Sequence, residues 1–388
     1  MLDPLLYNLV PHIILFQAVV LLIVLSNTWI MRRTRQHPPL TIFPKLSILI
    51  PARNEEKNIA RCVRSLLAQD YPAFEVLVLD DQSTDATYAI LQEIASRQAG
   101  LKILSGSLLP EGWMGKNWAC TQLSRQAQGD LYFFTDADTV FQPHALRAIV
   151  TAFSGEQADL LTGFPHQDLH TWGERLIVPF FSWASYCFTP LALAYRLKLP
   201  ALAFAVGQML LFRREAYEAI GGHERIGSSI VEDLDLARQI TAAGLRWRVT
   251  EVADLITTRM YTSSRAAFEG FSKNFFAAFH FRVLPFLLAY GCLAVVFWAP
   301  LTLLILTCFN LIPTLPIDIA EAVFCIVLSL LLWLIPYYYL RVPLPLALLY
   351  PLTLWVVFAV GCNSLVDSLT GRLHWKDRHL SRPRWRWL

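Results

Sequence analysis

Apolar and polar positions alternate in a regular way between residues 46 and 258. Short apolar runs at Leu46–Ile50, Phe74–Leu79 and Leu131–Thr135 end in polar clusters. Such runs indicate buried strands. Segments with helical spacing of apolar residues follow the first two runs, at 59–67 and 86–94. The alternation predicts a mostly parallel sheet with crossover helices, so we expect an α/β fold.

A second pattern, longer and almost uncharged, flanks this region. Leu5–Ile30 is long enough to span a bilayer and is followed by Arg32, Arg33 and Arg35. No Lys or Arg precedes it, which favours an uncleaved anchor with its amino end outside and the following residues in the cytoplasm. Three further stretches have spanning length: Leu284–Ile312, Ile317–Leu340 and Leu344–Leu365.

These patterns predict five regions. We expect a transmembrane anchor at 1–31, a cytosolic domain at 45–260, an interfacial amphipathic helix at 261–282, a transmembrane region at 283–370 and a basic tail at 371–388. Counting the spans alternately places the tail outside, against the tendency of basic flanks to stay inside. Either one stretch is re-entrant or the tail breaks that rule, and both options stay open.

Composition excludes several classes of protein. The chain has 388 residues, of which 55% are hydrophobic, and its mean hydropathy of +0.42 is too high for an ordinary soluble enzyme. A net charge of +3 without a nucleic-acid motif suits a membrane surface better than nucleic acid. The seven cysteines form no Cys-x-x-Cys pair, which argues for reduced thiols and against a zinc site.

The strongest candidate for a metal-binding site follows the apolar run at 131–135. Asp136 and Asp138 stand two positions apart, so in an extended chain both carboxylates point the same way. Hard oxygen ligands of this kind hold Mg²⁺ or Mn²⁺ against substrate phosphates. The plainer alternative is a polar loop that leaves a sheet.

Two more polar clusters end the other predicted strands. Asn54 and Glu55 follow the first strand, and Asp80 and Asp81 end the second. In parallel sheets, ligands bind beyond the carboxyl ends of the strands, where all these clusters fall. Asn54-Glu55-Glu56 also suits a helix N-cap with acids in the first turn.

Lys116 lies in a glycine-punctuated loop, 112–119, that enters a helix. The loop lacks the P-loop pattern, but a lysine at a helix start can contact a diphosphate; a solvated lysine is the alternative. Farther on, Ser229 and Glu232 have the spacing of a capping box. That box leaves Asp233 unexplained, and we expect Asp235 to be solvated.

The apolar segment Leu176–Leu211 is interrupted by prolines and basic residues. These breaks favour interfacial helices or an apolar acceptor groove over a spanning helix, with ordinary core as the alternative.

Together the acids divide into three roles. One pair can accept hydrogen bonds from a nucleobase or ribose, a second can hold a metal on a diphosphate, and an acid across the site can take a proton from a hydroxyl. This division fits transfer of a sugar from a nucleotide donor with inversion.

The ordered set resembles the family 2 glycosyltransferases, inverting enzymes with the GT-A fold. The residues that carry the resemblance, over roughly Leu46 to Thr258, are Pro51-Ala52-Arg53-Asn54-Glu55, Asp80-Asp81-Gln82-Ser83, Gly115-Lys116, Asp136-Ala137-Asp138 and Glu232-Asp233. The flanking apolar segments look like the membrane-bound branch that includes ceramide glucosyltransferases and bacterial hopanoid-associated and carotenoid glycosyltransferases.

The resemblance implies that Asp233 is the catalytic base, that Asp81 binds the uracil or ribose, and that Asp138 with Asp136 holds the metal-bound diphosphate. The cofactor would be Mg²⁺ or Mn²⁺. The remaining residues expected to contact substrate are Pro51, Asn54, Glu55, Asp80, Lys116, Gly207, Gln208 and Glu232.

One departure concerns the Gln/Arg-x-x-Arg-Trp motif of many relatives. Arg246-Trp247 has Ala243 where that Gln or Arg belongs, and Arg384-Trp385 has Ser381. The departure argues against a processive polysaccharide synthase. Arg259, Arg265 and Lys273 are candidates for the missing contact by position alone.

Our leading hypothesis is an integral protein of a bacterial inner membrane that transfers a hexose from a UDP-sugar donor to the hydroxyl of a membrane lipid. A carotenoid, hopanoid or sphingolipid-like acceptor fits the apolar segments. The alternative enzyme is a polyisoprenyl-phosphate glycosyltransferase, and a transporter or scaffold is the alternative from another class. Transport would require ionisable groups inside the spans, but only His12 stands well inside one, and Asp318, Glu321 and Asp367 lie near span ends.

Overall fold

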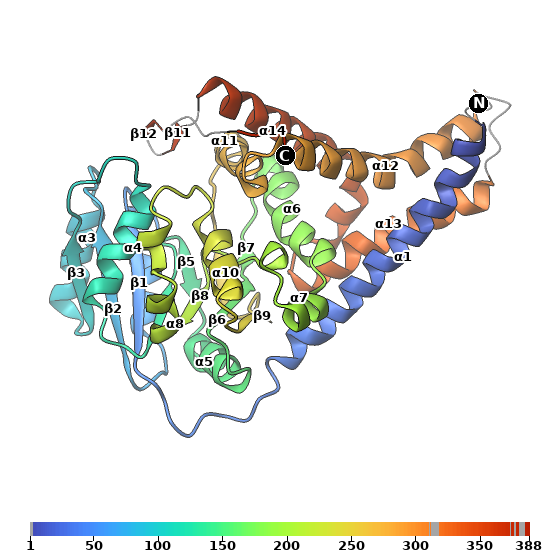
Figure 1. The fold of residues 1–388 in the computed structure, drawn as a ribbon. Helices are drawn as coiled ribbons and strands as arrows, with labels where there is room; N and C mark the ends of the chain where they lie inside the picture. Colours follow the sequence, from blue (N-terminus) through green and yellow to red (C-terminus); the bar gives the residue numbers. More distant parts are fainter. Residues whose placement is uncertain (1–2, 310, 312–317, 373, 376–377, 380–384) are drawn as a thin grey trace. The chain divides into compact units, whose positions relative to one another are not determined.

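The chain forms two compact units, which are described separately. The computed structural model describes residues 3–309, 311, 318–372, 374–375, 378–379 and 385–388 (Figure 1). The sheet unit comprises Thr28–Asp168 and Leu191–Met260, and the helical unit comprises Met1–Asn27, Leu169–Pro190 and Tyr261–Leu388. Helix α1 (Asp3–Arg33) begins in the helical unit and ends in the sheet unit.

A seven-stranded sheet in the order β3-β2-β1-β4-β8-β6-β9 forms the centre of the sheet unit (Figure 1). Strand β8 is antiparallel to both of its neighbours, and the other pairs are parallel. The strands are β1 (Leu46–Ala52), β2 (Phe74–Asp80), β3 (Leu101–Ser105), β4 (Leu131–Phe134), β6 (Leu160–Phe164), β8 (Leu210–Arg213) and β9 (Trp247–Glu251). A second, three-stranded sheet contains β5 (Thr139–Phe141), β10 (Ile256–Thr258) and β7 (His166–Gln167).

Helices of the sheet unit bury the apolar residues that the sequence pattern identifies. In α2, Ile59, Cys62, Val63 and Leu66 are buried against the core that includes Ile48 and Phe133. The mostly parallel α/β fold is therefore confirmed. The helices are α2 (Ile59–Leu67), α3 (Thr87–Arg97), α4 (Gly115–Gln126), α5 (Ala145–Gly155), α7 (Leu191–Leu197), η1 (Pro200–Leu202), α8 (Arg214–Ala219), α9 (Gly222–Arg225) and α10 (Glu232–Ala242).

The end of α1 and the segment after it are attached to the sheet unit by side chains. The hydroxyls of Thr34 and Thr250 lie 2.5 Å apart. Arg35 pairs with Asp254 at 2.7 Å, and His37 contacts Glu156 at 2.9 Å. The sheet unit therefore begins at Thr28, ahead of the predicted domain start at residue 45.

The helical unit contains the apolar segments. Among the residues that the structure describes, four helical segments are long and apolar enough to cross a membrane, at Leu9–Arg33, Val283–Cys308, Ile319–Tyr339 and Leu344–Thr370. A fifth crossing would require α6 and α7 to act as one bent pair. The elements are α6 (Trp172–Phe188), α11 (Ser264–Asn274), η2 (Ala277–Phe279), α12 (Val283–Cys308), α13 (Ile319–Tyr339), η3 (Leu344–Leu349), α14 (Tyr350–Thr370), β11 (His374–Trp375) and β12 (Arg378–His379).

Some of the aromatic residues of segment 261–282 pack inside the helical unit, and the interfacial role of the segment stays a prediction. Phe271 and Phe275 are buried, and their rings lie 5.6 and 5.2 Å from the ring of Phe181 in α6. The helical segment also ends at Asn274, and the backbone takes positive φ at His280 and Phe281. Packing against α6 therefore accounts for the positions of Phe271 and Phe275.

Candidate active site

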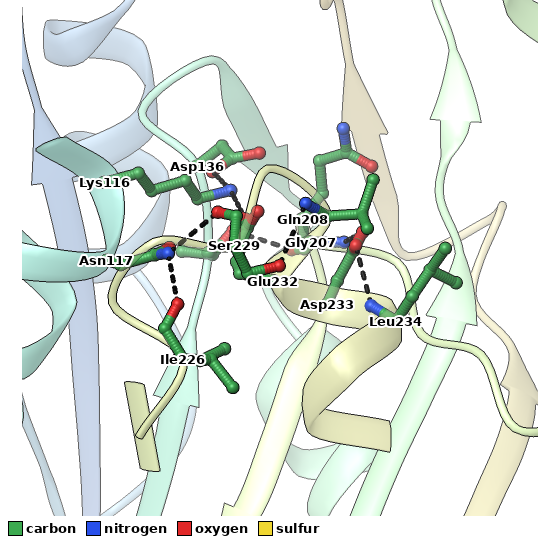
Figure 2. A network of polar contacts seen from close by, with 12 residues as sticks. Lys116, Asn117, Asp136, Gly207, Gln208, Ile226, Ser229, Glu232, Asp233 and Leu234 are labelled. Atoms are coloured by element: carbon green, nitrogen blue, oxygen red, sulfur yellow. Dashed lines mark hydrogen bonds and ion pairs between the residues drawn. The ribbon is translucent and has the colours of Figure 1, made fainter. Parts of the chain in front are cut away.

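Lys116 and two acids from different elements form one network in the sheet unit. The Lys116 ammonium lies 2.7 Å from Asp136 Oδ1 and 2.8 Å from Glu232 Oε1 (Figure 2). Burial lowers the pKa of Lys116, but the charges of Asp136 and Glu232 outweigh it and hold that pKa well above its usual value. A charged lysine therefore joins the start of α4 to the residues that follow β4 and to the start of α10.

Asp233 stands beside this network and is oriented by backbone amides. Its Oδ2 accepts a hydrogen bond from the Gly207 N–H at 3.1 Å, and its Oδ1 accepts one from the Leu234 N–H at 2.8 Å (Figure 2). Burial and the negative charge of Glu232 raise the pKa of Asp233 to about 7. A carboxylate with a pKa near neutrality is suited to general base catalysis.

Asn117 holds the loop that leads to these acids. Its side-chain amide donates to the carbonyl oxygens of Ile226, Gly227 and Ser229 at 3.0, 3.2 and 2.9 Å (Figure 2). The side chain is fully buried. Sequence reasoning did not select Asn117. Its position directly after Lys116 in the glycine-punctuated loop was the only available signal.

Gly207 is a close-packed point of the site, because a Cβ atom there would lie 3.1 Å from Lys116 Nζ and 3.6 Å from Asp233 Oδ2. We expect Gly207→Ala to displace the ammonium and to lower any activity that depends on this network by about tenfold, the scale of a small misplacement of reacting groups. Steady-state kinetics would measure this. Gly291→Ala is the matched control, since nothing lies within 4 Å of that Cβ position. An unchanged rate in Gly207→Ala would show that the lysine tolerates the shift.

The ends of β1 and β2 contact one another through the residues predicted there. Asn54, with φ of 53°, accepts a hydrogen bond from the Thr84 N–H at 2.8 Å. Asp80 and Asp81 are buried, and the Arg53 guanidinium donates to the Asp81 carbonyl oxygen at 2.7 Å. These residues therefore occupy neighbouring strand ends at the carboxyl edge of the sheet. Pro51 lies in β1 opposite Leu79 of β2, and β1 extends two residues beyond the predicted end at Ile50.

Asp138 lies just after β4, with its Oδ1 3.1 Å from the Thr258 hydroxyl that donates to it. Burial and the negative charges of Asp136 and Glu55 raise the pKa of Asp138 to about 7. Over the described ranges, no group of three or more His, Cys, Asp or Glu side chains could hold a metal ion by itself. Two Asp carboxylates nevertheless match the donor set of Mg²⁺ or Mn²⁺, which take their other ligands from substrate phosphates and water. The residues thus fit a metal that is shared with the substrate.

Two predicted local caps are wrong. Ser229 and Glu232 form no capping box: the N-cap of α10 is Val231, Glu232 pairs with Lys116, and the Ser229 hydroxyl donates to Asp235 at 2.6 Å. Asp235 is consequently half-buried and not solvated as expected.

The N-cap of α2 is Asn58, which makes no side-chain cap, so Asn54 does not cap this helix. In both loops, long-range partners replace the local contacts that the spacing predicts.

The remaining predicted residues divide between the units. Gln208 is buried in the sheet unit, and its carbonyl oxygen accepts from the Thr135 hydroxyl at 2.8 Å. Arg265 and Lys273 belong to α11 of the helical unit, where Arg265 pairs with Glu269 at 2.7 Å. The segment 176–211 is split between the units, with α6 in the helical unit and α7, η1 and β8 in the sheet unit. Its interfacial role stays a prediction.

Part of the chain is similar to known proteins. Residues 47–221 match the family model described as Glycosyl transferase family 2. The 4,4'-diaponeurosporenoate glycosyltransferase of Staphylococcus haemolyticus is 28% identical over 234 residues, which cover 59% of this chain and 60% of that protein. The Staphylococcus aureus protein of the same name is 29% identical over 240 residues, with the same coverage. The match thus spans about 60% of the length of these curated relatives.

A solved structure has the same overall fold. The mannosyltransferase PcManGT from Pyrobaculum calidifontis, in complex with GDP-Man and Mn²⁺, has a TM-score of 0.52 and 17% sequence identity. The similarity covers 93% of this chain and 99% of that one. The expected GT-A-type fold is thereby confirmed.

Proposed function

Because residues 47–221 match the family model described as Glycosyl transferase family 2, we propose that this protein transfers a sugar, with inversion, from a nucleotide donor to the hydroxyl of a membrane lipid. The observation that carries the proposal is the position of Asp233. Two backbone amides orient this carboxylate next to the network of Lys116, Asp136 and Glu232. One site therefore contains a candidate base and a set of groups suited to a diphosphate.

The reaction requires one displacement. The oxygen of the acceptor hydroxyl forms a bond to the anomeric carbon, the bond from that carbon to the diphosphate oxygen breaks, and the hydroxyl proton passes to the Asp233 carboxylate. The Lys116 ammonium faces the negative charge that develops on the departing nucleoside diphosphate. A divalent metal held by Asp136 and Asp138 would supply further neutralisation of that charge when bound. Asp80 and Asp81, at the end of β2, would bind the nucleoside.

A lipid acceptor is supported by the apolar helices and by the relatives, which are named for a carotenoid acceptor, diaponeurosporenoate. That acceptor is a carboxylate, so the relatives support the lipid class of the acceptor and not its hydroxyl. A UDP-hexose is the donor we propose, and the membrane is a bacterial inner membrane with the sheet unit on its cytoplasmic side. Purified full-length protein, given labelled UDP-hexose, Mn²⁺ and a bacterial lipid extract, should transfer label to the organic phase. Labelled soluble sugar or long polymer as the sole product would refute the lipid acceptor.

The acceptor class can be tested separately. A polyisoprenyl phosphate, or any other acceptor that is already ionised, needs no base. If the Asp233→Asn variant retains most of its activity, an ionised acceptor replaces the hydroxyl in this proposal. If no UDP-sugar binds in calorimetry, the protein is a transporter or scaffold whose donor site has lost its function.

We expect the rate to depend on pH in the direction set by Asp233. The base must be deprotonated to accept a proton, and burial raises its pKa to about 7. The value of kcat/KM should therefore rise from pH 5.5, level off above pH 8, and fall by about tenfold for each pH unit well below the pKa. Initial rates at saturating Mn²⁺ would measure the profile. A flat profile over this range would exclude Asp233 as a titrating base.

We also expect the metal to depend on Asp138. Treatment with EDTA should abolish transfer, and added Mn²⁺ should restore it. Asp138→Asn, which removes one of the two proposed carboxylate ligands, should raise the Mn²⁺ concentration for half-maximal activity by about tenfold or more. Asp70→Asn, an exposed carboxylate paired with Arg147 after α2, is the control. Full activity in EDTA would contradict the metal assignment.

A further inference from the structure

The last residues of the sequence are hydrogen-bonded to the beginning of α12. The N–H groups of Val283 and Leu284 donate to the carbonyl oxygens of Arg386 and Trp387 at 2.9 and 3.1 Å, and the Arg386 N–H donates to the Phe281 carbonyl at 2.9 Å. The first N–H groups of a helix have no partner within it, so residues 386 and 387 satisfy two of them. The segment 385–388 therefore lies at the end of the helical unit where α12 begins.

Helix α14 runs back toward the same end. The ring of Tyr350, at its start, lies 6.0 Å from Phe297 near the middle of α12, whereas Phe358 lies 4.9 Å from Tyr290. Farther along, the Ser364 hydroxyl accepts from the N–H of Phe276, which precedes α12, at 2.9 Å. As the chain proceeds through α14, its partners move backward along α12. The two helices are antiparallel, and α14 ends where α12 begins.

Helix α13 has the same direction as α14. The Gln17 side-chain amide donates to the Val296 carbonyl oxygen and the Ser329 hydroxyl, and in the next core layer Leu303 and Cys325 pack together with Val10. Thus α12 and α13 run in opposite directions, and α13 and α14 run in the same direction.

The link between α13 and α14 does not recross a bilayer. The ring of Tyr350 lies 6.1 Å from that of Trp333, so the chain has returned only to the level of Trp333. Trp333 stands about 9 Å before the end of α13 at 1.5 Å per residue. A full crossing requires about 30 Å. Residues 340–349 consequently re-enter the apolar region partway, although Leu344–Thr370 has the length and composition of a span.

We infer that residues 344–370 form a re-entrant segment, and that Arg282 and residues 385–388 form a surface that binds anionic phospholipid headgroups on the membrane face where α12 begins. The chain leaves the sheet unit at Met260, and α11 and η2 are too short to cross before α12 begins. This inference concerns membrane attachment and does not rest on the proposed sugar transfer. It also removes the conflict between the basic tail and the positive-inside tendency.

The chemistry of this surface matches a bilayer interface. Trp385, Trp387 and Leu388 are 38%, 67% and 76% exposed, and the Arg282 and Arg386 side chains are exposed beside them. Tryptophan and arginine are the residues that occupy the headgroup layer, where the arginines attract anionic lipids. The surface continues into exposed leucines in the first turns of α12, Leu284, Leu287 and Leu288, which suit contact with acyl chains. This continuity favours lipid over a protein partner.

Cysteine labelling tests the membrane face. In a chain whose exposed cysteines are replaced by alanine (Cys292, Cys308 and Cys362), the other four are buried. Leu388→Cys reports on the surface formed by Arg282 and residues 385–388, Ser96→Cys on the sheet unit and Leu311→Cys on the far end of α12. Each variant is placed in sealed vesicles of both orientations and treated with a membrane-impermeant maleimide. We expect the thiols of Leu388→Cys and Ser96→Cys to react from one side and the thiol of Leu311→Cys from the other. Reaction of the Leu388→Cys thiol from the side of the Leu311→Cys thiol would overturn the inference, and Trp387→Cys provides a second reporter at this surface.

Lipid contact is tested on the same Leu388→Cys variant, labelled with a fluorophore at the introduced thiol and placed in nanodiscs that contain brominated lipid. Quenching should increase at least twofold when phosphatidylglycerol makes up about 30% of the lipid, and Arg282→Gln with Arg386→Gln should abolish that increase. Arg97→Gln, an exposed arginine paired with Glu93 in α3, is the control and should retain it. Equal quenching in zwitterionic and anionic nanodiscs would overturn the anionic-lipid assignment.

Discussion

Asp233→Asn should lower the turnover number for transfer to a hydroxyl acceptor by about 100- to 10,000-fold, the range that a positioned general base contributes. The amide oxygen of asparagine can still accept the Gly207 N–H, so we expect the loop and the donor site to keep their structure. Calorimetry with a UDP-sugar should therefore show nearly unchanged donor affinity. Any residual activity should also lose the acidic limb of its pH profile.

Asp235→Asn is the matched control for this prediction. Asp235 lies on the same helix, but its carboxylate accepts from the Ser229 hydroxyl at 2.6 Å and does not join the Lys116 network in the structure described here. The asparagine can accept the same hydrogen bond, so activity should stay within about threefold of wild type. Equal losses in both variants would indicate a folding effect at the start of α10 and remove the argument for a base.

Lys116→Met should weaken donor binding by about 10- to 100-fold, the effect of losing one charge-assisted contact to a diphosphate. It should also lower the free energy of unfolding by about 2 kcal/mol, because Asp136 and Glu232 would face each other without a cation. This loss of unfolding free energy is smaller than the range for fully buried ion pairs, because the side chains of Lys116, Asp136 and Glu232 are still 24%, 24% and 12% exposed. Calorimetry and denaturant unfolding would measure the two effects.

Two further variants separate charge from shape in that prediction. Lys116→Arg keeps the positive charge and should restore much of the donor affinity. Lys102→Met removes an exposed lysine from β3 and should change neither measurement. Unchanged donor affinity in Lys116→Met would confine this lysine to a structural role.

The sequence predicts the elements of the sheet unit better than their arrangement. Strands β1, β2 and β4 are recognisable because apolar runs buried on both faces end in polar residues. The insertion of antiparallel β8 between β4 and β6 depends on pairing between distant segments, which leaves no local pattern. The contact of Asp136 and Glu232 with the same lysine, Lys116, likewise depends on pairing between distant segments and leaves no local pattern.

The wrong predictions near the site share one physical cause. A capping box is a local contact of modest strength, and Glu232 makes a 2.8 Å ion pair with Lys116 in its place. Asn117 was missed for the converse reason. A buried asparagine at a helix start has no distinctive spacing, and its value comes from three carbonyl oxygens more than a hundred positions away in the sequence.

The contacts of residues 34–37 with β9, with Asp254 and with the end of α5 determine how the protein can be shortened for study. A chain that starts at residue 45 lacks Thr34 and Arg35, which contact Thr250 and Asp254, and it uncovers Gly155, against which the His37 ring packs. Such a fragment would expose newly unpaired polar groups and be prone to aggregation. Retaining the sequence from Thr28 onward keeps these contacts, so a chain shortened at its N-terminus should be cut within α1 and not after it.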